Sequence, residues 1–141
     1  VLPRHDHEFA WLAILVATDE ALATHHITKF TAAGGTDAEV AAILRIAAFA
    51  LGVRAYRFID RHWRAHLPGL DPRAAYLAAF RAAAGDVPLR LAHLAAVTVH
   101  TCRAAWDALE WQLVAAYADG VPEDELAEAL TLTMFPGSVP Y

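Results

Sequence analysis

The segment THHITKFTAAGGTDAEVAAIL (residues 24–44) aligns without a gap with EWQLVAAYADGVPEDELAEAL (residues 110–130). The offset of 86 positions places Gly34 on Gly120. Each segment reads as the end of a long helix with polar residues, a glycine stop and then a second, capped helix. Self-similarity over such a length is typical of a fold built from a repeated supersecondary unit. The sequence therefore predicts an all-α protein that contains the same helical unit twice.

The two expected repeats cover about residues 7–52 and 93–138 of one domain, residues 1–141. A chain of 141 residues has the length of one domain with its own core. Hydrophobic residues make up 57% of it and charged residues only 19%, which predicts that apolar surface is buried between subunits. We therefore expect a homo-oligomer in which the long helices meet.

Turn residues divide the chain into helices. Gly34 and Gly35 end the first long helix, and Thr36 with Glu39 forms a capping box for the next one. Gly52 loosens the second helix before a third stretch that Pro68 and Gly69 close. The helices expected on this basis cover about residues 7–33, 37–54, 55–67, 72–85, 89–119 and 122–136.

Charge and composition exclude several classes of function. The net charge is −5 and the eleven lysines and arginines are scattered, which argues against a nucleic-acid surface. The apolar runs are too short to span a bilayer, and no export signal is recognised, so a cytoplasmic protein that does not bind membranes is expected. A single cysteine, Cys102, excludes an internal disulfide and a CxxC redox pair.

The motif around His25 and His26 resembles the carboxymuconolactone decarboxylase branch of the carboxymuconolactone decarboxylase and alkylhydroperoxidase D-like superfamily. The double histidine, a glycine eight residues after His26 and the acidic entry to the next helix carry this resemblance. ILRIAAFALGVRAYRFID (residues 43–60) is similar to the segment between the halves of the duplicated, alkylhydroperoxidase branch. The resemblance implies a duplicated helical hairpin bundle of about six helices, assembled as a dimer, trimer or hexamer. Alanine-rich composition with arginine in place of lysine is similar to that of bacterial proteins.

The chain departs from the peroxidases of this superfamily, which use a CxxC pair, a histidine four residues later and an upstream glutamate. The glutamate position holds His7 in the first repeat and His93 in the second. Peroxide reduction needs an attacking and a resolving thiol, and neither repeat supplies them. A thiol peroxidase is therefore not expected. The cysteine and histidine positions hold Asp19, Leu22 and His26 in the first repeat, and Ala105, Ala108 and Gln112 in the second.

The resemblance to the decarboxylases implies an enzyme without a cofactor, in which a histidine and a glutamate move protons while a cation holds a substrate carboxylate. Histidine suits such acid–base work because its ordinary pKa lies near neutral pH. We expect a decarboxylase, lyase or isomerase that acts on a small carboxylate, lactone or enolisable ring. The candidate catalytic residues are His26, His25, His7 and Glu8. The candidate substrate-binding residues are Arg57, Arg54, His100, Trp106 and Glu110.

Two alternatives remain open. The chain has eight histidines, and those at its start, with Glu8, form a set that suits iron or zinc. The predicted metal ligands on this reading are His5, His7, Glu8 and His26. His62 and His66 also have a ligand-like spacing, on a helix face that reads equally well as solvated surface. The second alternative is a non-catalytic oligomeric relative, in which the His25–His26 pair only stabilises the end of its helix.

Overall fold

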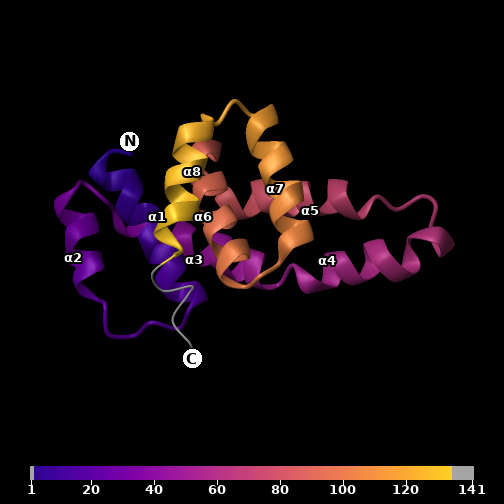
Figure 1. Cartoon of the computed structure of the whole chain (residues 1–141), viewed down its shortest axis with the longest axis horizontal. Coiled ribbons are helices and arrows are strands. Elements are labelled where there is room, and N and C mark those ends of the chain that lie inside the picture. The colour runs from indigo at the N-terminus through magenta and orange to yellow at the C-terminus, as the bar shows by residue number, and fades with distance from the viewer. Residues whose placement is uncertain (1, 135–141) are drawn as a thin grey trace.

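A computed structural model describes residues 2–134, and within this range all regular structure is helical (Figure 1). The expected all-α class is confirmed. No helix of the described residues is long and apolar enough to cross a membrane. The elements are α1 (Arg4–Ala17), α2 (His25–Ala32), α3 (Asp37–Leu51), α4 (Arg54–Phe58), a π-helical turn η1 (Ile59–Trp63), a 3₁₀ turn η2 (Arg64–His66), α5 (Pro72–Ala84), α6 (Leu89–Cys102), α7 (Trp106–Ala118) and α8 (Glu123–Leu132).

Helix α6 forms the centre of the fold. Every residue from Leu91 to His100 is buried, and α1, α3, α7 and α8 all pack against α6 (Figure 1). This segment, LAHLAAVTVH, is apolar on almost all sides, which is typical of a helix enclosed by others. Phe9, Phe80 and Leu94 are fully buried in the surrounding core.

Helices follow the same order in the two halves. Helices α1, α2 and α3 are followed about 86 residues later by α6, α7 and α8. In each half a glycine with positive φ ends the second helix, Gly34 with φ 95° and Gly120 with φ 80°. The next N–H in the chain, that of Gly35 or Val121, bonds back to a carbonyl five residues earlier, as in a Schellman motif.

Two of the expected helix ranges are wrong. The helix expected over residues 7–33 ends at Ala17 and a new helix begins at His25, so His25 and His26 lie at the start of α2. The helix expected over residues 89–119 ends at Cys102 and resumes at Trp106.

Both breaks are Schellman motifs that contain no glycine. Asp19 has φ 55° and Ala104 has φ 53°, a left-handed conformation that L-residues adopt only at a cost. The N–H of Glu20 bonds to the Leu15 carbonyl at 3.0 Å, and that of Ala105 to the His100 carbonyl at 2.9 Å. The sequence shows no break here because the usual signal, glycine after the last turn, is missing.

The expected starts of helices are accurate. The Thr36 hydroxyl accepts from the Glu39 N–H, and the Glu39 carboxylate accepts from the Thr36 N–H, so the capping box is confirmed. Asp71 caps α5 as expected. The last helix was expected to end at Pro136 and Gly137, which lie outside the described residues; within them α8 ends at Leu132.

Replacing Ala104 by glycine should stabilise the protein. Glycine removes a steric cost of about 1–2 kcal/mol from the folded protein. Its greater conformational freedom stabilises the unfolded chain and offsets about 0.4–1 kcal/mol of this gain. We expect Ala104→Gly to raise the free energy of unfolding by about 0.5–1 kcal/mol, measured by urea denaturation. Ala82→Gly, on the exposed face of α5, is the matched control and should lower it by about 1 kcal/mol. A loss of stability in Ala104→Gly would contradict the left-handed turn.

Candidate active site in the first half

A carboxylate and an imidazole meet between α1 and α2. Oε2 of Glu8 lies 2.7 Å from Nδ1 of His26, and Glu8 is only 3% exposed. An ionised carboxylate can only accept, so Nδ1 of His26 carries the hydrogen and donates it. A histidine that donates from one ring nitrogen to a carboxylate is fixed in tautomer and orientation. This hydrogen bond therefore fixes the position of one carboxylate oxygen of Glu8.

Aromatic rings and a second histidine surround this pair. Nδ1 of His7 lies 3.8 Å from the other oxygen of Glu8, Oε1. The ring of His26 lies 5.0 Å from the ring of Trp11 and 4.4 Å from the ring of His25. The structure thus brings together all four residues that the sequence proposed as catalytic.

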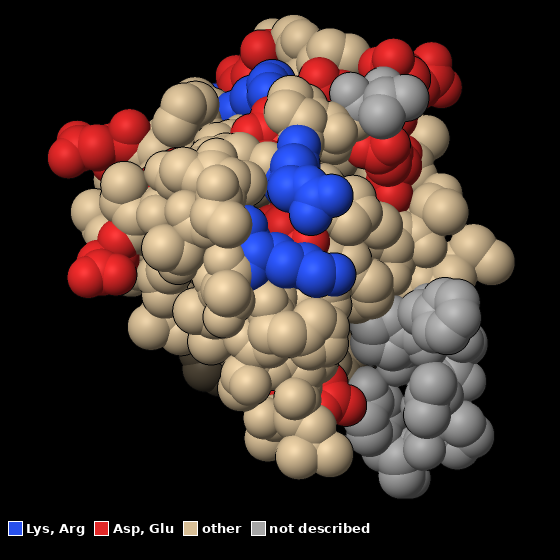
Figure 2. Space-filling model, turned by 90° about the vertical axis from the view of Figure 1, so that its left-hand side faces the viewer, with Lys and Arg blue, Asp and Glu red and all other residues tan. Residues whose placement is uncertain are grey.

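Glu8 and His7 open onto a surface depression of about 330 Å³. Its other lining residues are Leu2, Arg4 and Lys29, and His26 lies behind Glu8 outside the lining. Figure 2 views this end of the molecule, where basic side chains lie beside acidic ones in a mostly uncharged surface. The depression therefore combines two cationic side chains with a carboxylate and an imidazole.

Sequence reasoning missed Arg4 and Lys29 as the cations of this site. Arg4 is four residues before Glu8 and Lys29 is three residues after His26, so each lies on the same helix face as its partner. The helical spacing was visible in the sequence. The contact between α1 and α2 was hidden by the unrecognised break at residues 18–24.

The residues expected to bind substrate do not reach Glu8. Nε of Arg57 lies 2.5 Å from a carboxylate oxygen of Asp107, at the base of α7. His100 is fully buried in α6, whereas Trp106 is exposed. Arg54 is exposed at the start of α4, far from α1 in Figure 1. Glu110 lines a second depression of about 220 Å³ beside α5.

Three of the four predicted metal ligands divide between two hydrogen-bonded groups, with His5 in one and Glu8 and His26 in the other. Nδ1 of His5 lies 2.9 Å from Asp6, and its Nε2 lies 2.8 Å from Glu39 of the capping box. Burial lowers the pKa of His5, but these two carboxylates outweigh burial and raise it. Within residues 2–134 no group of three or more His, Cys, Asp or Glu is arranged to hold a metal ion. The metal alternative stays a prediction.

The second half contains a buried chain of hydrogen bonds. The Tyr76 hydroxyl lies 2.5 Å from Nε2 of His100 and donates to Oε1 of Gln112, also at 2.5 Å. The Gln112 amide lies 2.8 Å from Nδ1 of His93, whose Nε2 lies 2.7 Å from Asp119. Because the amide nitrogen and the tyrosine hydroxyl donate, every bond points the same way, from His100 to Asp119.

Burial keeps the two histidines of this hydrogen-bonded series, His100 and His93, neutral. Burial lowers the pKa of His100 to about 4, and the nearby Arg57 charge adds to the effect. Burial also lowers the pKa of His93, against the opposing effect of Asp119, whose own pKa is lowered by that hydrogen bond. Burial raises the pKa of Tyr76. The hydrogen-bonded series from His100 to His93 is therefore uncharged, and it ends at the partly exposed carboxylate of Asp119.

Comparisons with known proteins do not place the chain in a family, because no family model, curated protein or solved structure matches it.

The buried histidines should make stability depend on pH. A pKa of about 4 in the folded protein and 6.5 in the unfolded chain means that the unfolded chain binds more protons below pH 6.5. The contribution of His100 is complete above pH 6.5 and is lost as the pH falls towards 4, a change of about 3 kcal/mol. Urea denaturation at pH 7 and pH 4.5 measures it.

His100→Gln is the variant that isolates this effect. The amide can still donate to Tyr76, but it does not titrate. We expect the stability of the variant to fall less between pH 7 and pH 4.5 than that of the wild type. Equal losses in the two proteins would show that His100 is not held neutral by burial.

Proposed function

We propose that the protein is an acid–base enzyme that needs no cofactor and acts on a small carboxylate, with Glu8 and His7 at the reacting carbon. The observation that carries this proposal is the buried Glu8 carboxylate, which His26 holds at 2.7 Å on one oxygen and which lines a depression with two cations. Decarboxylation, lactone isomerisation and enolisation all require such a proton transfer next to a bound anion. The resemblance to the carboxymuconolactone decarboxylases points to the same chemistry.

The geometry supports a distinct role for each residue. Arg4 and Lys29 bind the substrate carboxylate, which orients the neighbouring carbon towards Glu8. Oε1 of Glu8 accepts the proton, because Oε2 already accepts a hydrogen bond from His26. His7, 3.8 Å from Oε1, returns a proton to the product. His26 positions Glu8 and does not itself meet the substrate.

Divergence between the two halves favours the first half as the reacting one. His93 and Gln112, which are in contact with each other, stand 86 positions after His7 and His26. Both are fully buried, and the position equivalent to Glu8 holds the apolar Leu94. The second half thus lacks a carboxylate at the position of Glu8, and its histidine and glutamine are closed to solvent.

The properties of Cys102 also support acid–base rather than thiol chemistry. Its side chain is partly buried, and burial raises the pKa of the thiol to about 11. A thiol that stays protonated at neutral pH is a poor nucleophile.

Exchange of substrate hydrogen for deuterium tests the proposal without knowledge of the natural substrate. A panel of lactones, β-keto acids and enolisable ring carboxylates is incubated with the protein in D₂O, and loss of the C–H signal is followed by proton NMR. We expect the wild type to catalyse exchange in at least one compound. Glu8→Gln should lose about 10²–10⁴-fold in rate, because it removes the proton acceptor. Lys29→Met should raise KM with a smaller effect on kcat.

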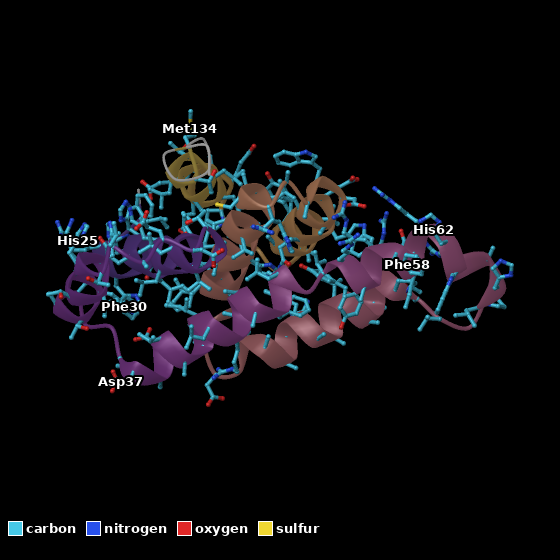
Figure 3. All side chains as sticks on the ribbon, turned by 90° about the horizontal axis from the view of Figure 1, so that it is seen from below. His25, Phe30, Asp37, Phe58, His62 and Met134 are labelled. Carbon is cyan, nitrogen blue, oxygen red and sulfur yellow. The ribbon has the colours of Figure 1, made fainter. Side chains whose placement is uncertain are left out.

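Two further variants make this test specific. His26→Asn should lower the rate and move its pH profile, since it frees Oε2 of Glu8. His62→Asn, an exposed histidine at the opposite end of the molecule (Figure 3), should exchange at the wild-type rate. Exchange that persists unchanged in Glu8→Gln would refute the proposal.

A further inference from the structure

A helical arm projects from the body of the protein. It consists of α4, η1, η2 and the first turn of α5, residues 54–75, and it extends to the right in Figure 1. Its base is held by ion pairs from Arg57 and Arg61 to Asp107 of α7. Beyond this point the chain leaves the core, and every residue from 61 to 71 is exposed.

The arm carries large apolar side chains that the described residues leave partly exposed. Trp63 is 50% exposed, and Leu67 and Leu70 are 42% and 39% exposed. Phe58 is also exposed and packs edge-on against Trp63 at 5.4 Å. Exposed apolar side chains in one contiguous segment mark a surface that contacts another molecule.

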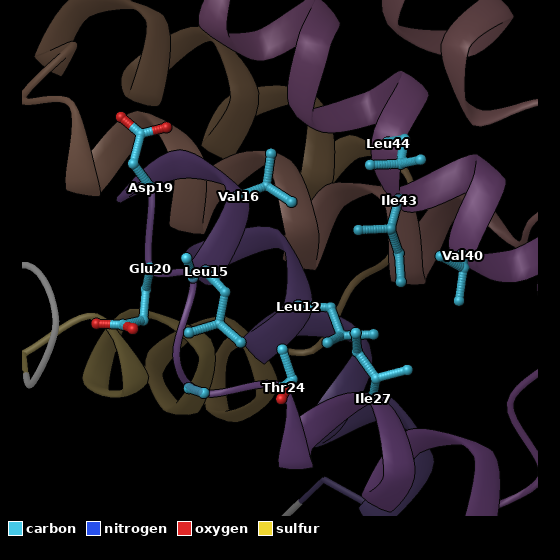
Figure 4. A pocket seen from close by; sticks show the side chains of 12 residues that line it. Leu12, Leu15, Val16, Asp19, Glu20, Thr24, Ile27, Val40, Ile43 and Leu44 are labelled. Carbon is cyan, nitrogen blue, oxygen red and sulfur yellow. The ribbon is translucent and has the colours of Figure 1, made fainter.

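An apolar groove lies on the body. It has a volume of about 460 Å³ and lies between α1, α2, α3 and the 18–24 turn (Figure 4). Leu15, Ile27 and Leu44 lie along it, and Leu22, in the same turn, is 90% exposed. In the second half α7 begins at Trp106, more than one turn earlier than α2 does in its own half.

The arm and the groove lie at opposite ends of the molecule. Figure 3 labels His25, beside the groove, at one end and Phe58 and His62, on the arm, at the other. The arm of a chain therefore does not reach the groove of the same chain. A second copy of the chain brings the two surfaces within reach of each other.

The charges of the two surfaces are complementary. From Arg54 to His66 the arm holds four arginines and two histidines against one acid, Asp60, which pairs with Arg64. Arg57 and Arg61 pair with Asp107 of α7, so four arginines against two acids leave this surface a net positive charge. The groove is lined by Asp19 and Glu20 and by no basic residue. Opposite charges around apolar surfaces steer association and fix its register.

We propose that the arm of one copy docks into the groove of a second copy of this chain, with Trp63 and Leu67 in the apolar part and the arm's arginines beside Asp19 and Glu20. If two copies exchange arms, they form a symmetric dimer. If each copy instead docks its arm into the next copy, they form a ring. This inference does not depend on the proposed enzyme activity, since neither surface contains Glu8, His7, Arg4 or Lys29.

Molecular mass in solution is the first test, by size-exclusion chromatography with light scattering. We expect the wild type to have at least twice the mass of one chain. The double variant Trp63→Ser with Leu67→Ser should have the mass of one chain and unchanged helix content, because both side chains are exposed. Glu20→Arg should weaken assembly, and combining it with Arg64→Glu should restore it. A monomeric wild type, or an arm variant that keeps the full mass, overturns the proposal.

Cross-linking between chains tests the contact itself. In a Cys102→Ser background, chains with Leu67→Cys and differently tagged chains with Leu44→Cys are mixed and mildly oxidised. We expect a disulfide between the two kinds of chain. Ala127→Cys, exposed on α8, replaces Leu44→Cys as the control and should give at least tenfold less of this product. Equal yields in the two mixtures would show that the groove does not receive the arm and that its occupant is another molecule.

Discussion

Helix α6 passes through the centre of the molecule with ten consecutive buried residues, and two of them are histidines. A buried imidazole needs partners for its ring nitrogens, because an unpaired polar group away from water costs about 1–3 kcal/mol. Tyr76 of α5 bonds to Nε2 of His100 and Gln112 of α7 bonds to Nδ1 of His93, which links the two histidines, whereas Nδ1 of His100 has no partner among the described residues. The packing of α5 and α7 around α6 is thereby tied to one set of hydrogen bonds. Asp119, bonded to both His93 and Arg81, connects this set to the surface.

Equivalent positions of the two halves have different surroundings. In the second half, His93 and Gln112 are sealed in the core, and burial keeps the histidine neutral. In the first half, the turn over residues 18–24 replaces a continuation of helix, and Glu8 meets His26 at the edge of a depression. The contact of the second half is therefore enclosed in the core, whereas Glu8, itself only 3% exposed, lines a depression beside two cations.

The sequence predicted the elements that have strong local signals. Thr36 with Glu39 and Asp71 with Pro72 mark helix starts through side-chain caps, and Gly34 and Gly120 mark helix ends because glycine adopts positive φ without strain. The turns at Asp19 and Ala104 carry no such signal, since tertiary packing forces ordinary residues into a left-handed conformation. The cluster of His7, Glu8, His25 and His26 was predicted from the resemblance. Arg4, Lys29 and Tyr76 were missed because their roles depend on contacts between helices.

A crystal structure of the protein soaked with a small enolisable carboxylate tests the central claim most directly, because it locates both the side chains and the bound anion. We expect the carboxylate between Arg4 and Lys29, its neighbouring carbon facing Oε1 of Glu8, and Oε2 still bonded to His26. An anion bound at the Arg73 and Arg81 side of the molecule, with the depression beside Glu8 empty, would contradict the account. So would a structure in which Glu8 and His26 are apart.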